Sequence, residues 1–179
     1  MVKLDLRQRT IFKGVGANVI GYDVVEKDYL GDTCTQVDLE TLLKESDIIS
    51  MHMPYFKGSN DEFLNATLIS KMKDGVILIN TSRGELQDID AILDALSNQE
   101  KFKHLVQMSS QTKQTYFNKD LRGTEVDAPM TRIMNLYPRV LVTPHVGSYT
   151  DEAVSNMVEY SYENLQEFIN TGTSKNELA

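Results

Sequence analysis

Residues 75–96 read GVILINTSRGELQDIDAILDAL, and this stretch decides the fold class of the chain. It opens with an apolar run, residues 75–81, whose length and composition are typical of a buried strand. A polar turn follows, and apolar residues then recur at the spacing of three and four that indicates a helix. These residues are Ile89, Ile92, Leu93 and Leu96. The stretch therefore predicts a strand, a turn and a helix in immediate succession.

The same alternation extends along the rest of the chain. Four further short apolar runs are predicted as strands, namely residues 17–23, 47–52, 104–107 and 139–143. Helical spacing recurs in Leu39, Leu42 and Leu43, and again in Leu64, Leu68, Ile69 and Met72. Because strands that alternate with helices form parallel sheets, we expect an α/β fold with a mostly parallel sheet and helices on both faces.

The segment from Thr150 to Ile169 is predicted to be a long helix. Thr150 is a favourable N-cap, Asp151 and Glu152 suit the first turn, and Gly172 is a suitable stop. One face carries a broad apolar stripe. Its members are Ala153, Val154, Met157, Val158, Tyr162, Leu165, Phe168 and Ile169.

Composition limits the classes of partner. The 179 residues carry a net charge of -8, which repels nucleic acid and anionic membrane surfaces, so neither is expected as a partner. A single cysteine, Cys34, cannot form an internal disulfide, and no apolar run reaches membrane-spanning length, so we expect a cytoplasmic protein. His52, His104 and His145 are far apart in the sequence, and no metal site is predicted.

Three predicted strand ends carry residues suited to chemistry. Asp23 could accept hydrogen bonds from the hydroxyls of a ribose, or it could be solvated surface. Arg83, in the turn after residues 75–81, could bind a carboxylate through a bidentate pair, or could belong to an ordinary turn. His145 precedes the long helix and could act as a general acid or base, or be a buried structural imidazole.

Taken together, four runs resemble one family. They are FKGVGANVIGYD (12–23), SDIISMHMPYFKGSN (46–60), KMKDGVILINTSRGELQD (71–88) and VLVTPHVGSYTDEAVSNMVEYSYENL (140–165). In this order and spacing they resemble the cofactor domain of the D-isomer-specific 2-hydroxyacid dehydrogenases, in the branch that includes D-lactate dehydrogenase. The resemblance implies a Rossmann-like fold, NAD as cofactor, a small 2-hydroxy or 2-keto acid as substrate, and a homodimer.

The resemblance also assigns roles to individual residues. It implies that Asp23 binds the adenosine ribose, that Met53 and Pro54 flank the cofactor, and that Thr81 lies near the nicotinamide ribose. Arg83 would hold the substrate carboxylate beside the cofactor. His145 would exchange a proton with the substrate oxygen while hydride moves to or from NAD.

Two segments depart from the family pattern. Counting back from Tyr116 and Phe117 places the family's Asp at Met108 and its catalytic Glu at Lys113, and a lysine beside His145 would disfavour the imidazolium. Counting back from Phe12 likewise places Val2 and Asp5 at the last two glycines of G-x-G-x-x-G. An aspartate there opposes a pyrophosphate.

A displaced reading frame explains both departures. Allowed codons for residues 1–9, read one nucleotide earlier, give Gly-Lys-Ile-Gly-Leu-Thr-Ala-Ala, which restores the glycine turn. The same displacement of residues 107–115 gives Asp-Val-Phe-Pro-Asn-Glu-Thr-Asn, which restores the acids. We hypothesise a dehydrogenase gene with small insertions or deletions, either decaying or misread. Coding DNA that cannot be read in this way would refute the hypothesis.

The fold is expected to be an incomplete Rossmann-like sheet whose first strand is missing or replaced. That strand is central in dinucleotide-binding folds, so a partner strand or a weakened sheet should result. Residues 1–6 (MVKLDL) alternate like a strand, but Leu4, Ile11 and Val15 fit the family's helix, which we prefer. We expect residues 1–179 to form a single partial NAD-binding domain without the substrate domain.

Two functions follow as expectations. The first is a remnant of an NAD-dependent D-2-hydroxyacid dehydrogenase that is inactive as written, because the phosphate cradle, the paired acid and the substrate domain are each lost. The second is a non-catalytic binding or dimerisation module that retains the sheet.

Overall fold

The computed structural model describes residues 3–25, 32–97, 101–107, 128–143, 146–147 and 149–177. The chain divides into two compact units, Met1–Pro144 and His145–Ala179. The elements in chain order are α1 (Lys3–Gly14), β1 (Ile20–Gly21), β2 (Thr35–Gln36), α2 (Leu39–Glu45), β3 (Ile48–Met51), α3 (Ala66–Lys71), β4 (Val76–Asn80), the 3-10 helix η2 (Gly84–Leu86), α4 (Ile89–Ser97), β5 (Phe102–Gln107), α5 (Ala128–Met134), β6 (Val140–Val142) and α6 (Asp151–Thr171).

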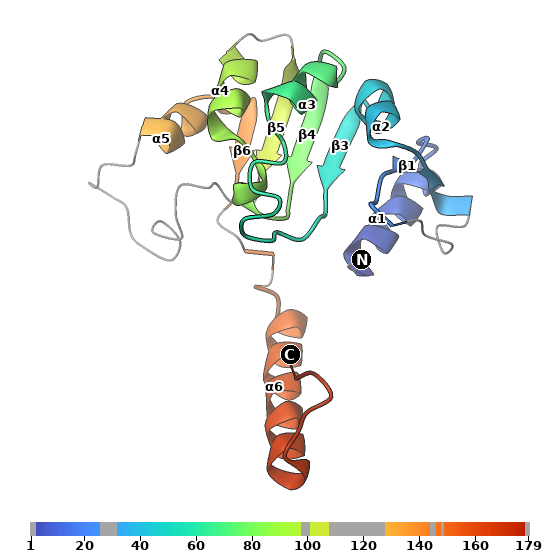
Figure 1. Ribbon diagram of the computed structural model, residues 1–179, viewed down its shortest axis with the longest axis vertical. Coiled ribbons are helices and arrows are strands. Elements are labelled where there is room, and N and C mark those ends of the chain that lie inside the picture. The colour runs from blue at the N-terminus through green and yellow to red at the C-terminus, as the bar shows by residue number, and fades with distance from the viewer. Residues whose placement is uncertain are drawn as a thin grey trace. The chain divides into compact units, whose positions relative to one another are not determined.

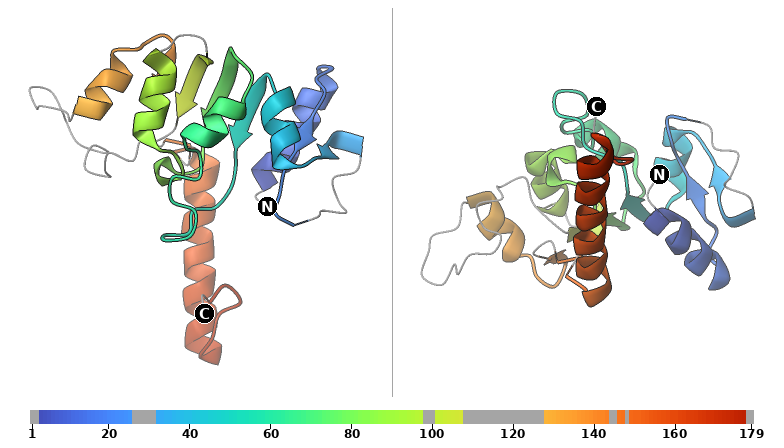
Figure 2. Two further views of the ribbon diagram at one scale, coloured as in Figure 1. Left: turned by 45° about the horizontal axis from the view of Figure 1, so that its top comes forward. Right: turned by 90° about the horizontal axis from the view of Figure 1, so that it is seen from below.

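Four strands of the first unit form a parallel sheet in the order β3-β4-β5-β6 (Figure 1). Apolar side chains of these strands pack with helices α3 and α4 into one buried cluster. Val76 and Leu78 of β4 and Ile92 and Leu96 of α4 all belong to this core. In the view from below, α3 and α4 lie on one side of the strands and α1 on the other (Figure 2). The predicted α/β class, with parallel strands between helices, is confirmed.

The remaining strands, β1 and β2, form a separate two-stranded parallel sheet. They approach closely, since a Cβ atom added to Gly21 would lie 2.9 Å from the Sγ of Cys34, so a side chain at position 21 would collide. Among the residues that the structure describes, no hydrogen-bonded ladder joins this pair to the larger sheet. The expected break in the sheet is therefore present.

The N-terminal segment is a helix, as preferred above, rather than a replacement for the first strand. α1 begins at Lys3 and ends at Gly14. Ile11, Phe12 and Val15, at and just beyond its C-terminal end, are exposed, although apolar residues of such a helix normally face a sheet. These three apolar side chains are therefore left largely uncovered by the described residues.

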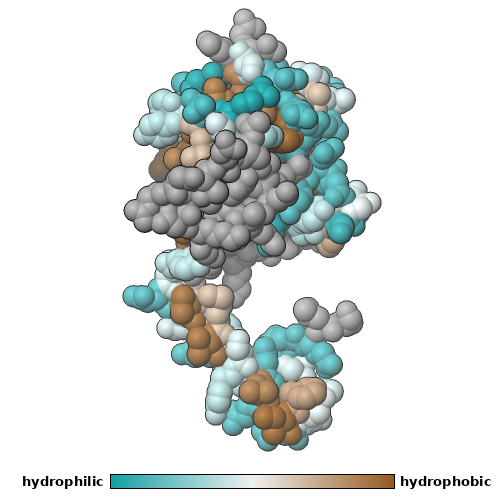
Figure 3. Space-filling view, turned by 90° about the vertical axis from the view of Figure 1, so that its left-hand side faces the viewer, coloured by the Kyte–Doolittle hydropathy of each residue, from teal (hydrophilic) through white to brown (hydrophobic). Residues whose placement is uncertain are grey.

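The second unit is dominated by α6, whose predicted ends are confirmed. The Thr150 hydroxyl accepts a hydrogen bond from the Ala153 amide at 3.1 Å, and Gly172 closes the helix with a φ of 77°. No residue of α6 is buried, and its apolar side chains gather on its surface (Figure 3).

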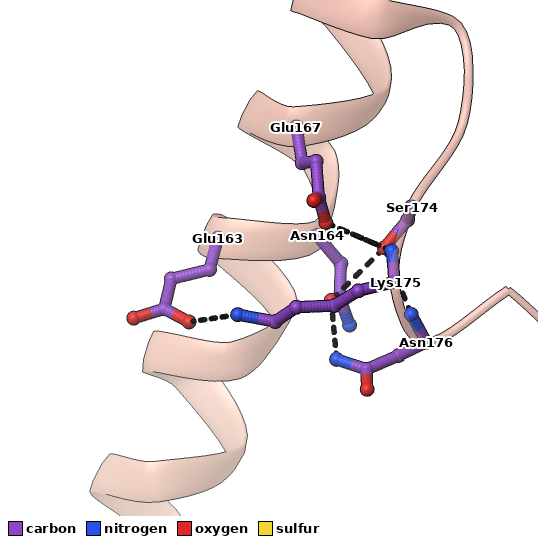
Figure 4. A network of polar contacts seen from close by, with 6 residues as sticks. All are labelled: Glu163, Asn164, Glu167, Ser174, Lys175 and Asn176. Carbon is purple, nitrogen blue, oxygen red and sulfur yellow. Dashed lines mark hydrogen bonds and ion pairs between the residues drawn. The ribbon is translucent and has the colours of Figure 1, made fainter.

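The chain returns along α6 after Gly172, through a polar network (Figure 4). The backbone amide of Lys175 donates to Glu167 at 2.9 Å, and the side chain of Asn176 donates to Asn164 at 2.7 Å. This network holds the returning segment against the polar side of the helix.

Candidate functional site

Asp23 follows β1 by two residues, at the carboxyl end where the ribose acid is expected. Its Oδ1 accepts a hydrogen bond from the Val25 amide at 3.1 Å, and its carbonyl accepts one from the Gln36 side chain at 3.5 Å. The half-buried carboxylate is thus held at the strand end by local bonds. This placement suits a ribose ligand. Binding of the adenosine ribose by Asp23 stays a prediction.

The turn that carries Thr81 and Arg83 is organised by Asn80, a residue that the sequence did not single out. Asn80 ends β4 and is only 2% exposed. Its Nδ2 donates to the Arg83 carbonyl at 2.9 Å, and its Oδ1 accepts from the Ser82 amide at 2.9 Å. A buried amide therefore fixes the backbone from which Arg83 projects into solvent.

The same turn is tied to the neighbouring strand. The Ser82 hydroxyl donates to the Met51 carbonyl at 2.8 Å, which joins the ends of β3 and β4. Met53 and Pro54 come just after Met51, separated from it by His52, with Met53 half-buried against the core and Pro54 exposed. The structure therefore brings the predicted cofactor-flanking residues and the Thr81–Arg83 turn to one edge of the sheet.

A compact loop continues from Pro54 to Asp61. The Tyr55 hydroxyl donates to Asp61 at 2.6 Å, and Asp61 also accepts from the Gly58 amide at 2.5 Å. The hydrogen bond to the Asp61 carboxylate raises the pKa of Tyr55 to about 12, and the same bond holds the pKa of Asp61 below its ordinary value. These bonds pre-form the loop beside the candidate site.

The remaining predicted catalytic residue, His145, lies outside the described residues, as do Met108 and Lys113. Met108 directly follows Gln107, the last residue of β5. Gln107 is 1% exposed, and its Nε2 has no hydrogen-bond partner in the part of the chain that the structure describes. A buried N–H donor of this kind is costly. The sequence did not single out Gln107, apart from its place at the start of the segment 107–115 for which a displaced reading frame is hypothesised.

The described residues suit the adenosine end of NAD but not its pyrophosphate group. Asp23 at the end of β1 suits the adenosine ribose. The pyrophosphate would need close-approaching glycines before α1, but Val2 and Asp5 stand at those positions, and Asp5 belongs to the first turn of the helix. Neither residue is a glycine, so the glycine pattern of a pyrophosphate cradle is not present at these two positions.

Other candidate sites are distinct from this edge. A shallow polar hollow of about 350 Å³ is lined by Glu163, Gln166, Glu167, Asn170 and Lys175 of the second unit, and it contains none of the predicted site residues. Within the described ranges, no group of three metal-ligating side chains gathers, and no helix has the length and hydropathy needed to cross a membrane.

Comparison with known proteins identifies the family. The profile of the D-isomer specific 2-hydroxyacid dehydrogenase NAD-binding domain matches residues 7–147. A D-lactate dehydrogenase of Lactiplantibacillus pentosus is 42% identical over 172 residues, which cover 94% of this chain and 50% of that protein. An aromatic 2-oxoacid reductase of Clostridium sporogenes is 36% identical over 93% of this chain and 50% of its own length.

Solved structures agree with the sequence relatives. A D-lactate dehydrogenase from Sporolactobacillus has a TM-score of 0.90 at 35% identity, covering 99% of this chain and 53% of its own. The Aquifex aeolicus enzyme, solved with NAD and lactic acid, has a TM-score of 0.84 at 31% identity over 97% of this chain and 54% of its own. NAD is thus the cofactor implied for this fold. The chain spans about half the length of the curated relatives it matches, and it belongs to the D-isomer specific 2-hydroxyacid dehydrogenase family.

Proposed function

We propose that this chain is a remnant of an NAD-dependent D-2-hydroxyacid dehydrogenase of the D-lactate type and that it does not catalyse the family reaction. By ancestry, that reaction transfers hydride between NAD and a 2-hydroxy or 2-keto acid. The observation that carries the proposal is the buried Nε2 of Gln107, which has no hydrogen-bond partner among the described residues. Gln107 is the first residue of the segment 107–115, in which we propose that a displaced reading frame replaces the sequence that would carry the family's acid.

Two separate contributions to catalysis are affected. Val2 and Asp5 replace the glycines that let a backbone approach pyrophosphate. Lys113 replaces the acid that would support a protonated His145, and a positive neighbour acts in the opposite sense. Residues 1–179 are proposed to form a single partial NAD-binding domain.

The proposal is tested by combining a binding measurement with an activity measurement. Residues 1–179 are titrated with NADH in a calorimeter, and the loss of NADH absorbance is followed with pyruvate present. We expect no turnover above the protein-free blank. Turnover that disappears in an Arg83→Ala variant would overturn the proposal, and it would also contradict the interpretation of Lys113.

The second candidate is a non-catalytic module that binds an adenosine group or a second copy of the chain. It is favoured by the exposed apolar side chains of α6, because such a stripe invites self-association. Saturable NADH binding that is lost in Asp23→Ala, without turnover, would favour this module. We further propose that the chain is cytoplasmic and forms a homodimer.

A further inference from the structure

Gln36, at the end of β2, fastens the backbone that carries Asp23. Its Nε2 donates to the Asp23 carbonyl at 3.5 Å and to the Val25 carbonyl at 3.2 Å. A side-chain amide nitrogen carries two N–H donors, so each carbonyl can receive one of them. The turn after β1 is therefore held to the neighbouring strand by the side chain of Gln36. Its own bond between the Val25 amide and the Asp23 carboxylate acts within the turn.

Apolar packing contributes little to this turn in the part of the chain that the structure describes. The side chains of Val24 and Val25 are 84% and 55% exposed, so neither is anchored in the core. Asp23 itself is half-buried. Because a segment with few buried contacts opens easily, the direction of the Asp23 carboxylate depends on the hydrogen bonds that fix its backbone.

Gln36 is in turn held by the strand pair to which it belongs. The amides of Thr35 and Val37, on either side of it, donate to the carbonyls of Val19 and Gly21 at 3.0 and 2.9 Å. A slip of this register by one residue would turn the side chain of Gln36 to the other face. The donors that reach the Asp23 turn therefore come from a paired strand and not from a loop.

A ribose presents two adjacent hydroxyls, and a carboxylate binds both only when it faces both of them. We propose that Gln36 is a positioning residue that holds Asp23 for these paired hydroxyls and thereby selects ribonucleosides over nucleosides that lack them. The inference rests on the adenosine-binding module proposed above. Gln36 acts through Asp23, and no contact with the nucleoside is assigned to it.

The experiment titrates residues 1–179 with adenosine and, separately, with dideoxyadenosine, which lacks both ribose hydroxyls. Adenosine carries no phosphate, so its binding does not depend on a pyrophosphate cradle. The amide NMR shift of Val25, the donor to Asp23, reports both dissociation constants. We expect the parent chain to bind adenosine at least about tenfold more tightly, because the acceptor of the hydroxyls is charged. No preference in the parent chain would refute both the ribose site and the role of Gln36.

Gln36→Met removes both donors from a side chain of similar length. We expect it to reduce the preference for adenosine at least about threefold. A merely structural role of Gln36 would weaken the binding of both nucleosides alike and leave their ratio unchanged. Thr35→Val is the matched control, since it removes a hydroxyl from the adjacent residue of the same strand and should keep the parent preference.

A double-mutant cycle shows whether Gln36 acts through Asp23. The preference should vanish in Asp23→Ala, and adding Gln36→Met should then change it no further. A preference that is lost in Asp23→Ala but kept in Gln36→Met would refute the role of Gln36 and leave the ribose site standing. An equal loss in Thr35→Val and Gln36→Met would also refute that role. Gln36→Asn, whose shorter side chain withdraws the donors from both carbonyls, provides the same comparison if Gln36→Met does not fold.

Discussion

The side chain of Asn80 holds the backbone of Arg83, with Nδ2 donating to the Arg83 carbonyl at 2.9 Å from a position that is 2% exposed. The same amide accepts the Ser82 N–H through its oxygen. The direction in which the predicted substrate-binding guanidinium leaves the sheet therefore depends on a buried residue of β4.

We expect Asn80→Leu to lower the free energy of unfolding by about 1–3 kcal/mol, because leucine leaves the part-buried Ser82 amide without its acceptor. Urea denaturation measures the change. Ser82→Ala is the control, since it removes the separate bond to the Met51 carbonyl and should cost about 1 kcal/mol or less. A midpoint for Asn80→Leu equal to that of the parent chain would show that the turn is held by other contacts.

For a substitution of Gln107 we expect a gain in stability, opposite to the loss expected for Asn80→Leu. Replacing it with leucine removes a buried amide that has no described partner and leaves an apolar side chain of similar size in the core. We expect Gln107→Leu to raise the free energy of unfolding by about 1–3 kcal/mol, measured by the same denaturation.

An exposed glutamine serves as the control for this substitution. Gln166 lies on the surface of α6, and Gln166→Leu should change stability by about 0.5 kcal/mol or less. A loss of stability in Gln107→Leu would mean that the amide has a partner beyond the described residues. That result would remove the structural support for a foreign segment after β5.

The elements with strong apolar patterns were predictable from the sequence, and the others were not. The runs that became β3, β4, β5 and β6 are apolar and short, and both ends of α6 carry capping signals. β2 contains only Thr35 and Gln36 and exists because it pairs with β1, which is a long-range contact. α5 includes Pro129 near its start and is only 7 residues long, so its local pattern did not indicate a helix.

The sequence predicted which residues of the candidate site lie at the ends of strands. Asp23, Met53, Pro54, Thr81 and Arg83 all follow strands, as their patterns indicated. The roles of Asn80 and Gln107 were not predictable, because one depends on hydrogen bonds within a folded turn and the other on burial by distant residues. The spacing of apolar residues along the sequence reveals neither a hydrogen bond within a turn nor burial by distant residues.

The loop beside the site should respond to alkaline pH through Tyr55. Its hydrogen bond to Asp61 raises its pKa to about 12 from an ordinary 10.0. Because the neutral hydroxyl is the form that donates, the bond contributes fully below pH 10 and is lost as the pH rises through about 12. We expect the late phenolate transition in the ultraviolet titration to disappear in Tyr55→Phe and to move toward 10.0 in Asp61→Asn.

At acidic pH the loop should respond through Asp61, whose pKa is shifted in the opposite direction to that of Tyr55. The pKa of Asp61 is lowered, so its contribution to the loop is present above the ordinary value of 3.8 and is lost as the pH falls through the lower value. Amide shifts of Phe56 and Gly58 report this opening by NMR. Glu62→Gln removes a neighbouring charge without touching the bond and should leave both transitions unchanged. If both transitions also shifted in Glu62→Gln, the cause would be a general effect of charge rather than the contact between Tyr55 and Asp61.

The apolar stripe of α6 makes a prediction about association. Leu165 lies within it and is 57% exposed, with Val158, Phe168 and Ile169 exposed along the same helix. If a second copy covers the stripe, Leu165→Glu would bury a charge without a partner, and such burial is strongly unfavourable. We expect the parent chain to sediment as a dimer and Leu165→Glu to shift the dimer dissociation constant by at least about tenfold toward monomer.

Asn156→Glu is the matched control for this substitution. It adds the same charge to the same helix, but Asn156 is nine residues from Leu165, which is two and a half turns and places it on the opposite side. Helix content, followed by circular dichroism, should be similar in the two variants, so a difference in association reports the stripe itself. A parent chain that remains monomeric at high concentration would exclude self-association through α6, and the dimerisation module would then lose the observation that favours it.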